Sequence, residues 1–180
     1  MKKLVLIALI PLALVACQKA ETIPSKIIVA PKDTIPDGAA FKVQMVKDSI
    51  YQYEIAIHFF HGFHLNYSLS ETIYGGEDST VPSLPPSLNL SAITSDGVLV
   101  NVDGVPYTPG MSIPLDANAA DGAYFLRTSY QQNIPSYIHF WCKDNYLKDS
   151  IDLRTGNYHF NINNADTNSF GKNRFKIVVR

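Results

Sequence analysis

The chain has 180 residues, with 15 lysine and arginine residues against 16 aspartate and glutamate residues, and 46% of its residues are apolar. This composition excludes a disordered acidic or basic chain, and the absence of a basic excess argues against nucleic-acid binding. Its 2 cysteines are too few for a disulfide-rich scaffold or a cysteine-rich zinc domain. The length predicts one domain.

The chain begins with the pattern of an export signal. Lys2 and Lys3 form a short positive region, and an apolar stretch at 4–13 follows, interrupted once by Pro11. The stretch is too short to span a bilayer as a helix, which needs about 20 apolar residues, but it has the length of a secretory signal core. Leu14-Val15-Ala16-Cys17 comes directly after it and resembles the lipobox of bacterial lipoproteins.

This resemblance implies that 1–16 is a signal peptide, cleaved before Cys17, and that Cys17 carries acyl chains as the first mature residue. Several acyl chains would give firm membrane anchoring. Gln18 is not the aspartate that is associated with inner-membrane retention, so we expect an outer-membrane lipoprotein on either the surface or the periplasmic face. The alternative is an ordinary secretory signal with a chance cysteine. After cleavage, Cys142 has no disulfide partner within the chain.

Residues 17–40 contain Pro24, Pro31 and Pro36 and show no sustained hydrophobic period. Prolines at this spacing favour extended conformers. We therefore expect a lipidated N-terminus followed by a semi-rigid tether. The apolar run Ile27–Val29 is an alternative first strand.

From residue 41 onward, apolar and polar residues alternate with a period of two, which predicts strands and a β domain spanning 41–180. The strands predicted in this way are 41–46, 54–59, 137–142, 158–162 and 174–180. Asp-Gly pairs at 37–38, 96–97, 103–104 and 121–122 predict turns between strands. Around the third pair, Val98–Val102 and Val105–Tyr107 predict a hairpin. Short strands separated by such turns predict an antiparallel β-sandwich.

Two tyrosines follow acidic turns in the manner of the tyrosine corner of immunoglobulin-like sandwiches. Tyr158 follows Asp152 and a glycine, and Tyr124 follows Asp121 and a glycine. In such a corner, the buried hydroxyl bonds to nearby backbone. The predicted fold class is therefore all-β, an antiparallel immunoglobulin-like β-sandwich. The Cys…Trp…Cys framework of antibody domains is absent.

Motifs over the C-terminal three-fifths of the chain resemble a β-sandwich module found near the C-termini of surface proteins from type IX-secreting bacteria. The matching segments are Tyr74–Asp78, Ser95–Gly97, Val100–Pro106, Ser112–Leu115, Gly122–Tyr124, Asp152–Leu153, Gly156–Phe160 and Asn173–Phe175. The resemblance implies a spacer or interaction domain and not an enzyme. Two departures from the family pattern are expected: no sorting tail after the module, and a lipobox in place of the long secreted architecture. We expect a stand-alone, lipid-anchored version of the module.

Three histidines form the one chemical cluster in the sequence: His58, His61 and His64. Neutral imidazoles ligate zinc or copper. On a strand, His58 and His64 share a face while His61 points away, but a bend at Gly62 would allow all three to meet. The alternative is a structural role among packed aromatics, and no cofactor is expected. Glu77 and its neighbouring aspartate similarly suggest either a calcium ligand or a solvated turn.

The strand predicted at 137–142 has two contrasting faces. Tyr137, His139 and Trp141 lie opposite a face that includes Cys142, which we expect to be buried and unreactive. An exposed aromatic stripe of this kind stacks on sugars or anchors a protein partner. The alternative is that the N-terminal segment or a loop covers it.

Motifs for enzyme chemistry are missing from the sequence: there is no Gly-x-Ser-x-Gly elbow, no His-Glu-x-x-His and no phosphate loop. We therefore expect a lipid-anchored, non-catalytic protein of the cell envelope that binds a protein partner in an outer-membrane or surface assembly. Surface glycan binding through the same aromatic stripe is the alternative.

Overall fold

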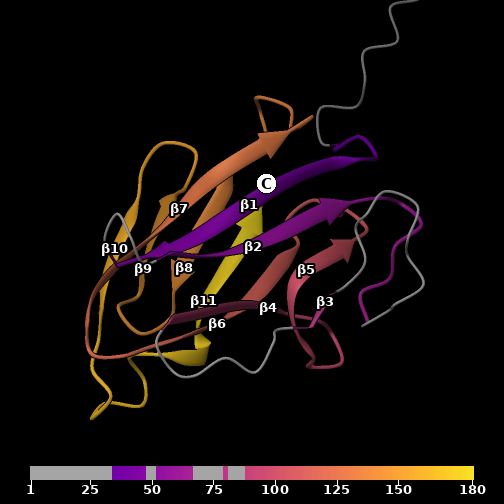
Figure 1. The fold of residues 1–180 in the computed structure, drawn as a ribbon. Coiled ribbons are helices and arrows are strands. Elements are labelled where there is room, and N and C mark those ends of the chain that lie inside the picture. Colours follow the sequence, from indigo (N-terminus) through magenta and orange to yellow (C-terminus); the bar gives the residue numbers. More distant parts are fainter. Residues whose placement is uncertain (1–33, 48–51, 67–78, 81–87) are drawn as a thin grey trace, which may run out of the picture.

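The computed structural model describes residues 34–47, 52–66, 79–80 and 88–180. Every regular element in these ranges is a strand, which confirms the all-β prediction (Figure 1). The strands are β1 (Ala39–Val46), β2 (Gln52–Phe59), β3 (Ser79–Thr80), β4 (Leu88–Ile93), β5 (Leu99–Val105), β6 (Ser112–Ala119), β7 (Gly122–Gln132), β8 (Phe140–Asp144), β9 (Asp149–Asp152), β10 (Tyr158–Ile162) and β11 (Gly171–Val179). Within the described ranges no helix is suited to crossing a membrane.

The strands form one continuous sheet in the order β10-β7-β1-β2-β5-β4-β6-β11-β8-β9, and β3 pairs with β5. Neighbouring strands are antiparallel except β2 and β5, which run parallel from Ala56–Phe59 beside Val102–Val105. The prediction of a purely antiparallel arrangement is therefore wrong at this pair. Parallel neighbours need a long connection, so this pairing joins segments that lie far apart in the sequence.

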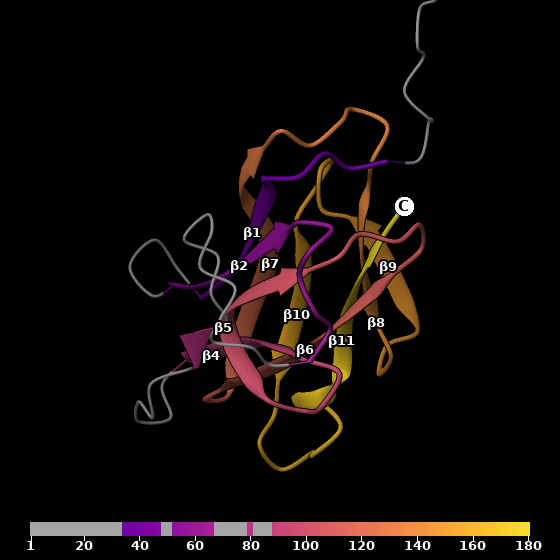
Figure 2. The ribbon, with the colours of Figure 1, turned by 90° about the vertical axis from the view of Figure 1, so that its right-hand side faces the viewer.

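The sheet folds over so that its two halves face each other across a shared core (Figures 1 and 2). Phe41 of β1 stacks on Phe140 of β8 with 4.0 Å between ring centroids. Phe160 of β10 meets Phe175 of β11 edge to face at 4.7 Å. These contacts tie the layer containing β10, β7, β1 and β2 to the layer containing β6, β11 and β8, because each pair joins strands that are not neighbours in the sheet.

The period-two pattern located most of the strands it predicted. The strand at 158–162 has the predicted bounds, and those at 41–46, 54–59 and 174–180 agree to within a few residues. At 137–142 the regular strand begins only at Phe140, because the chain turns at Tyr137. The predicted alternation nevertheless holds, since Ile138, Phe140 and Cys142 are all buried.

The hairpin predicted around Asp103 and Gly104 is wrong. Both residues lie inside β5 and pair with Ile57 and His58 of β2. The other Asp-Gly pairs do form turns, and their glycines Gly38, Gly97 and Gly122 have positive φ angles of 77°, 86° and 151°. Pairing with β2 thus overrides the local turn signal at 103–104.

The folded domain begins earlier than position 41. Ile35 is 1% exposed and belongs to the core, and β1 starts at Ala39. The predicted tether at 17–40 therefore overlaps the domain at its C-terminal end. Cys17, the alternative strand at Ile27–Val29 and the alternative calcium ligand Glu77 lie outside the described residues.

Candidate functional site

A fully buried ion pair closes one end of the domain. Arg174 of β11 donates from Nη2 to Oδ2 of Asp144 in β8 at 3.0 Å, and from Nε to the same oxygen at 3.1 Å. The two side chains are 1% and 0% exposed. Nη1 of Arg174 also donates to the backbone oxygens of Asn161 and Ser169. Hydrogen bonds from several directions are what a buried charge requires, so this pair fixes how β8, β10 and β11 meet.

Aromatic rings surround the Arg174 guanidinium. Its central carbon lies 4.6 Å from the ring centroid of Phe175, 4.8 Å from Phe160 and 5.2 Å from Tyr146. A cation over ring faces is attracted by their electron density, and exclusion of water strengthens that attraction. In the alternation that predicts a strand at 174–180, Arg174 falls opposite Phe175 and Ile177, on the face expected to point away from the core. It is buried instead, because a register shift between Gly171 and Phe175 rotates this part of β11.

The two predicted tyrosine corners differ. The hydroxyl of Tyr124 donates to the backbone oxygen of Ala120 at 2.8 Å, which confirms that corner. The hydroxyl of Tyr158 donates instead to Oδ2 of Asp144 at 3.1 Å, so the predicted backbone bond is wrong there. Burial and the nearby Asp144 carboxylate raise the pKa of Tyr158, so its hydroxyl stays protonated and remains a donor at neutral pH.

Beside this ion pair, the turn at 145–148 between β8 and β9 presents exposed apolar side chains. Tyr146 is 42% exposed and Leu147 is 53% exposed. The hydroxyl of Tyr146 donates to Oδ2 of Asp166 at 2.8 Å. That hydrogen bond lowers the pKa of Asp166 and raises the pKa of Tyr146. Tyr146 is therefore held by its hydroxyl and by the guanidinium over its ring, while much of its surface stays open.

An open groove of about 550 Å³ lies between this turn and the segment that leads into β11. Its lining includes Tyr146, Lys148, Thr167, Phe170, Lys172 and Asn173, with Arg174 behind them. Within the part of the chain that the structure describes, the side chains of Lys148, Thr167, Lys172 and Asn173 make no hydrogen bond or ion pair. The groove therefore combines a fixed aromatic ring with polar groups that have no intramolecular partner.

The predicted aromatic stripe lies at the other end of β8. The hydroxyl of Tyr137 donates to the backbone oxygen of Thr34 at 2.9 Å, so Tyr137 contacts the entering N-terminal segment. His139 places Nδ1 2.6 Å from Oδ2 of Asp152. Trp141 is half-buried. In the sheet its backbone lies beside Asp152 of β9 on one side and beside Val178 of β11 on the other. The polar groups of Tyr137 and His139 are thus engaged within the domain.

Asp152 and Arg154 make further hydrogen bonds to the backbone at this end of β8. Oδ1 of Asp152 accepts from the backbone N–H groups of Phe140 at 3.3 Å and Arg154 at 3.0 Å. Nη1 of Arg154 donates to the backbone oxygens of Pro135 at 2.8 Å and Ile138 at 2.5 Å. The turn that precedes β8 is consequently held by both side chains.

The structure does not bring the three predicted metal ligands together. His58 lies on β2, where burial and the nearby Lys42 lower its pKa, so its ring is neutral at pH 7. His61 sits in the turn after β2 and places Nδ1 2.6 Å from Oδ1 of Asp37, and its hydrogen bond lowers the pKa of that carboxyl group. His64 lies further along, in an exposed stretch. In the described ranges, no group of three or more histidine, cysteine, aspartate or glutamate side chains could hold a metal ion.

Cys142 is buried, as predicted, with 0% of its surface exposed. Burial raises the pKa of its thiol, and the neighbouring Asp144 adds to that effect. Because the thiolate is the reactive form, Cys142 acts here as a small apolar core residue.

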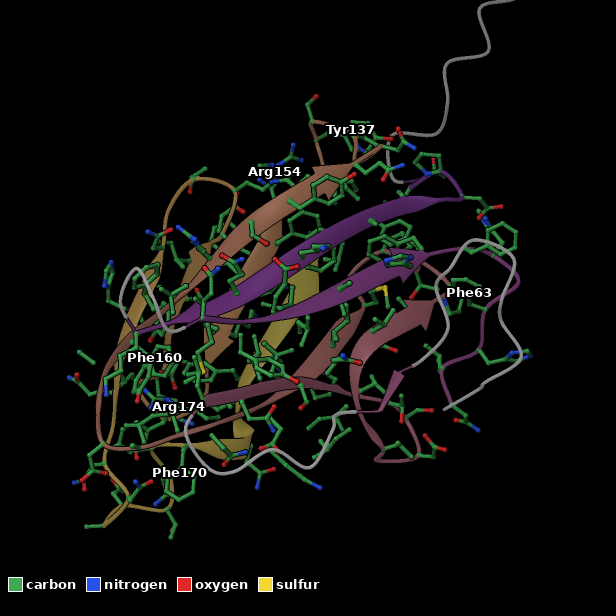
Figure 3. The ribbon with its side chains drawn as sticks, viewed as in Figure 1. Phe63, Tyr137, Arg154, Phe160, Phe170 and Arg174 are labelled. Atoms are coloured by element: carbon green, nitrogen blue, oxygen red, sulfur yellow. The ribbon has the colours of Figure 1, made fainter. Side chains whose placement is uncertain are left out.

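The groove and the end held by Asp152 and Arg154 lie at opposite ends of β8. His139 precedes the strand and Asn145 follows it, which separates them by about 20 Å at about 3.3 Å per residue. Figure 3 shows Tyr137 and Arg154 at one end of the domain and Phe170 and Arg174 at the other. The chain matches no protein-family model, no curated protein and no solved structure.

Proposed function

We propose that this chain is a lipid-anchored protein of the cell envelope with a non-catalytic binding role in an outer-membrane or surface assembly. The anchor in this proposal is Cys17, and the support for it is the lipobox-like Leu14-Val15-Ala16-Cys17. The observation that carries the binding role is the opposite placement of the N-terminal segment and the groove. Thr34 contacts Tyr137 at one end, and the groove opens at the other.

This placement suits a protein held by its N-terminus. The residues from Cys17 to Thr34 can span at most about 60 Å, at about 3.5 Å per residue. The end of the domain that they enter is the end joined to the anchor. The groove lies at the opposite end, away from the point of attachment.

The proposal includes the immunoglobulin-like classification of the sandwich and its likeness to the module of type IX-secreting bacteria. The facing layers joined by Phe41 and Phe140 and the corner at Tyr124 support it. The parallel pairing of β2 with β5 is a departure from that pattern.

We place the partner surface at the groove and not at Tyr137, His139 and Trp141. Tyr137 and His139 already bond to Thr34 and Asp152, so their polar groups are not available for new hydrogen bonds to a partner. Lys172 and Asn173 lie in an exposed stretch and make no side-chain hydrogen bond within the described residues. A partner gains most from polar groups that it can satisfy without breaking others.

The anchor is tested by replacing Cys17 with alanine in the full chain. Cells are fed an alkyne-tagged palmitate and then fractionated. We expect the wild-type protein to carry the tag and to sediment with outer membranes, and Cys17→Ala to lose both properties. A Cys17→Ala protein that keeps the tag and the membrane location would contradict the proposed anchor.

The binding role is tested by in-cell photocrosslinking. A photoreactive phenylalanine analogue is placed at position 172 in the groove or, as a control, at position 130, where the exposed Tyr130 lies on β7. The proposal predicts one discrete adduct from position 172 and none of that size from position 130. Equal adduct patterns at the two positions, or no adduct from the groove, would contradict a binding role for this end.

A further inference from the structure

Tyr146 has the geometry of a preformed stacking platform. The Arg174 guanidinium lies over its ring, 5.2 Å from the centroid, and its hydroxyl bonds to Asp166. The orientation of the ring and the position of the hydroxyl are thus restricted before any ligand arrives. The exposed part of the ring lines the groove. Fixing a ring in advance lowers the entropic cost of stacking a ligand on it.

The polar groups around this ring are of mixed character. Asn173 supplies an amide that both donates and accepts, and Thr167 supplies a hydroxyl that does the same. Within the described residues these side chains make no hydrogen bond. Groups that donate and accept beside an aromatic ring match a ligand that carries many hydroxyls on a ring with apolar C–H faces.

The groove is also positively charged. Lys148 and Lys172 line it, and neither ammonium group has an ion-pair partner in the described part of the chain. The acids of the surrounding segments have other partners: Asp144 pairs with Arg174, Asp166 accepts from Tyr146, and Asp149, which follows Lys148, accepts from the backbone N–H of Ser150. Two unpaired ammonium groups at one groove favour a ligand with negative charge.

From this combination we infer that the groove binds an acidic oligosaccharide, with a sugar ring on Tyr146 and carboxylates at Lys148 and Lys172. The inference rests on the proposed binding function and names its ligand class. An acidic peptide fits less well, because the groove offers one half-buried apolar side chain, Phe170, besides Tyr146 and so few pockets for peptide side chains.

The test uses the full chain in detergent micelles and calorimetric titration. The probes are uronic-acid trisaccharides, a neutral trisaccharide of the same length, and a glutamate hexapeptide. We expect saturable binding of at least one uronate probe, about tenfold tighter than the neutral sugar. We expect Tyr146→Ala to weaken uronate binding about tenfold, and the control Tyr130→Ala, which changes a similarly exposed tyrosine elsewhere, to leave it within about twofold.

Lys172→Glu is the second variant, since an exposed lysine can be replaced without disturbing the core. It is expected to reduce uronate binding about tenfold and to leave binding of the neutral sugar unchanged, whereas Lys176→Glu on β11 has a much smaller effect. The inference is overturned if no uronate probe binds saturably, if the neutral trisaccharide or the hexapeptide binds as tightly as the uronate probes, or if Tyr146→Ala leaves uronate binding unchanged. A discrete photocrosslink from position 172 without saccharide binding would overturn this inference alone and leave the proposed function standing.

Discussion

A buried carboxylate lies at each end of β8, Asp144 on the strand itself and Asp152 on the neighbouring β9, but the two have different partners. At the groove end, Asp144 pairs with Arg174, and both side chains are almost completely buried. At the end that meets the N-terminal segment, Asp152 is 7% exposed and its partner His139 is 46% exposed. Arg154 then ties the adjacent turn through two backbone oxygens.

The difference concerns which polar groups remain for a ligand. At the groove end the Asp144–Arg174 ion pair is buried. Several polar side chains that line the groove make no hydrogen bond or ion pair within the described residues. The other end uses its side chains at the surface to hold the chain itself. We therefore expect the groove end to bind a partner and the other end to hold the N-terminal segment that leads to the anchor. The following predictions test this contrast from the largest effect to the smallest.

Arg174→Met should give the largest loss of stability. It leaves the buried Asp144 carboxylate without a cationic partner, with hydrogen bonds only from Tyr158 and from the backbone N–H groups of Tyr146 and Leu147. Breaking a buried ion pair in this way costs about 3–5 kcal/mol of unfolding free energy. Urea denaturation followed by Trp141 fluorescence measures this change. The double variant Arg174→Met, Asp144→Leu should recover much of the loss, because it removes the unpaired charge. Equal stability of Arg174→Met and wild type would show that the pair does not organise this end.

Asp152→Ala should cost less, about 2 kcal/mol, at the opposite end of β8. It removes the acceptor for His139 and for the backbone N–H groups of Phe140 and Arg154, but water reaches the half-exposed His139 and replaces part of the lost bonding there. The same urea titration compares it with Arg174→Met. If Asp152→Ala lowered the unfolding free energy more than Arg174→Met does, the predicted order of the two variants would be wrong.

Tyr158→Phe and Tyr124→Phe compare a hydroxyl bonded to a carboxylate with one bonded to a backbone oxygen. A hydrogen bond to a charged group contributes about 1.5–3 kcal/mol and a neutral one about 0.5–1.5 kcal/mol. We expect Tyr158→Phe to lower the melting temperature more than Tyr124→Phe does. Scanning calorimetry on the pair decides the order, and a larger effect at Tyr124 would contradict it.

The smallest effect should be a pH dependence from His58. Burial and Lys42 lower its pKa in the folded protein, while the unfolded chain keeps the ordinary value of about 6.5. The unfolded state therefore binds more protons as the pH falls through about 6.5, and the unfolding free energy falls with it. His58→Gln should reduce this dependence between pH 7.5 and 5.5. Identical pH profiles for the variant and the wild type would show that His58 does not contribute.

Local pattern in the sequence predicted those features that depend on near neighbours. Alternation located β2 and β10 because one face of each strand is buried and the other is more exposed. It failed at Asp103, where pairing with the distant β2 outweighs a turn signal, and at Arg174, where a register shift turns a charged residue inward.

The groove could not be predicted because its two segments meet only in the folded chain. The turn at 145–148 and the segment at 167–173 show no hydrophobic period and lie about 20 residues apart in the sequence. The aromatic stripe was visible because its residues share one stretch. Its partners Thr34 and Asp152 come from elsewhere, so pattern alone did not indicate that two of its three residues are engaged.

Amide hydrogen exchange of the intact protein tests the contrast between the two ends most directly. The protein in its native membranes is compared with the same protein purified in detergent, where envelope ligands are removed. The account predicts that the native membranes add protection at 145–148 and 167–173 and leave exchange at 134–139 unchanged. Added protection at 134–139 with none at the two groove segments would contradict it.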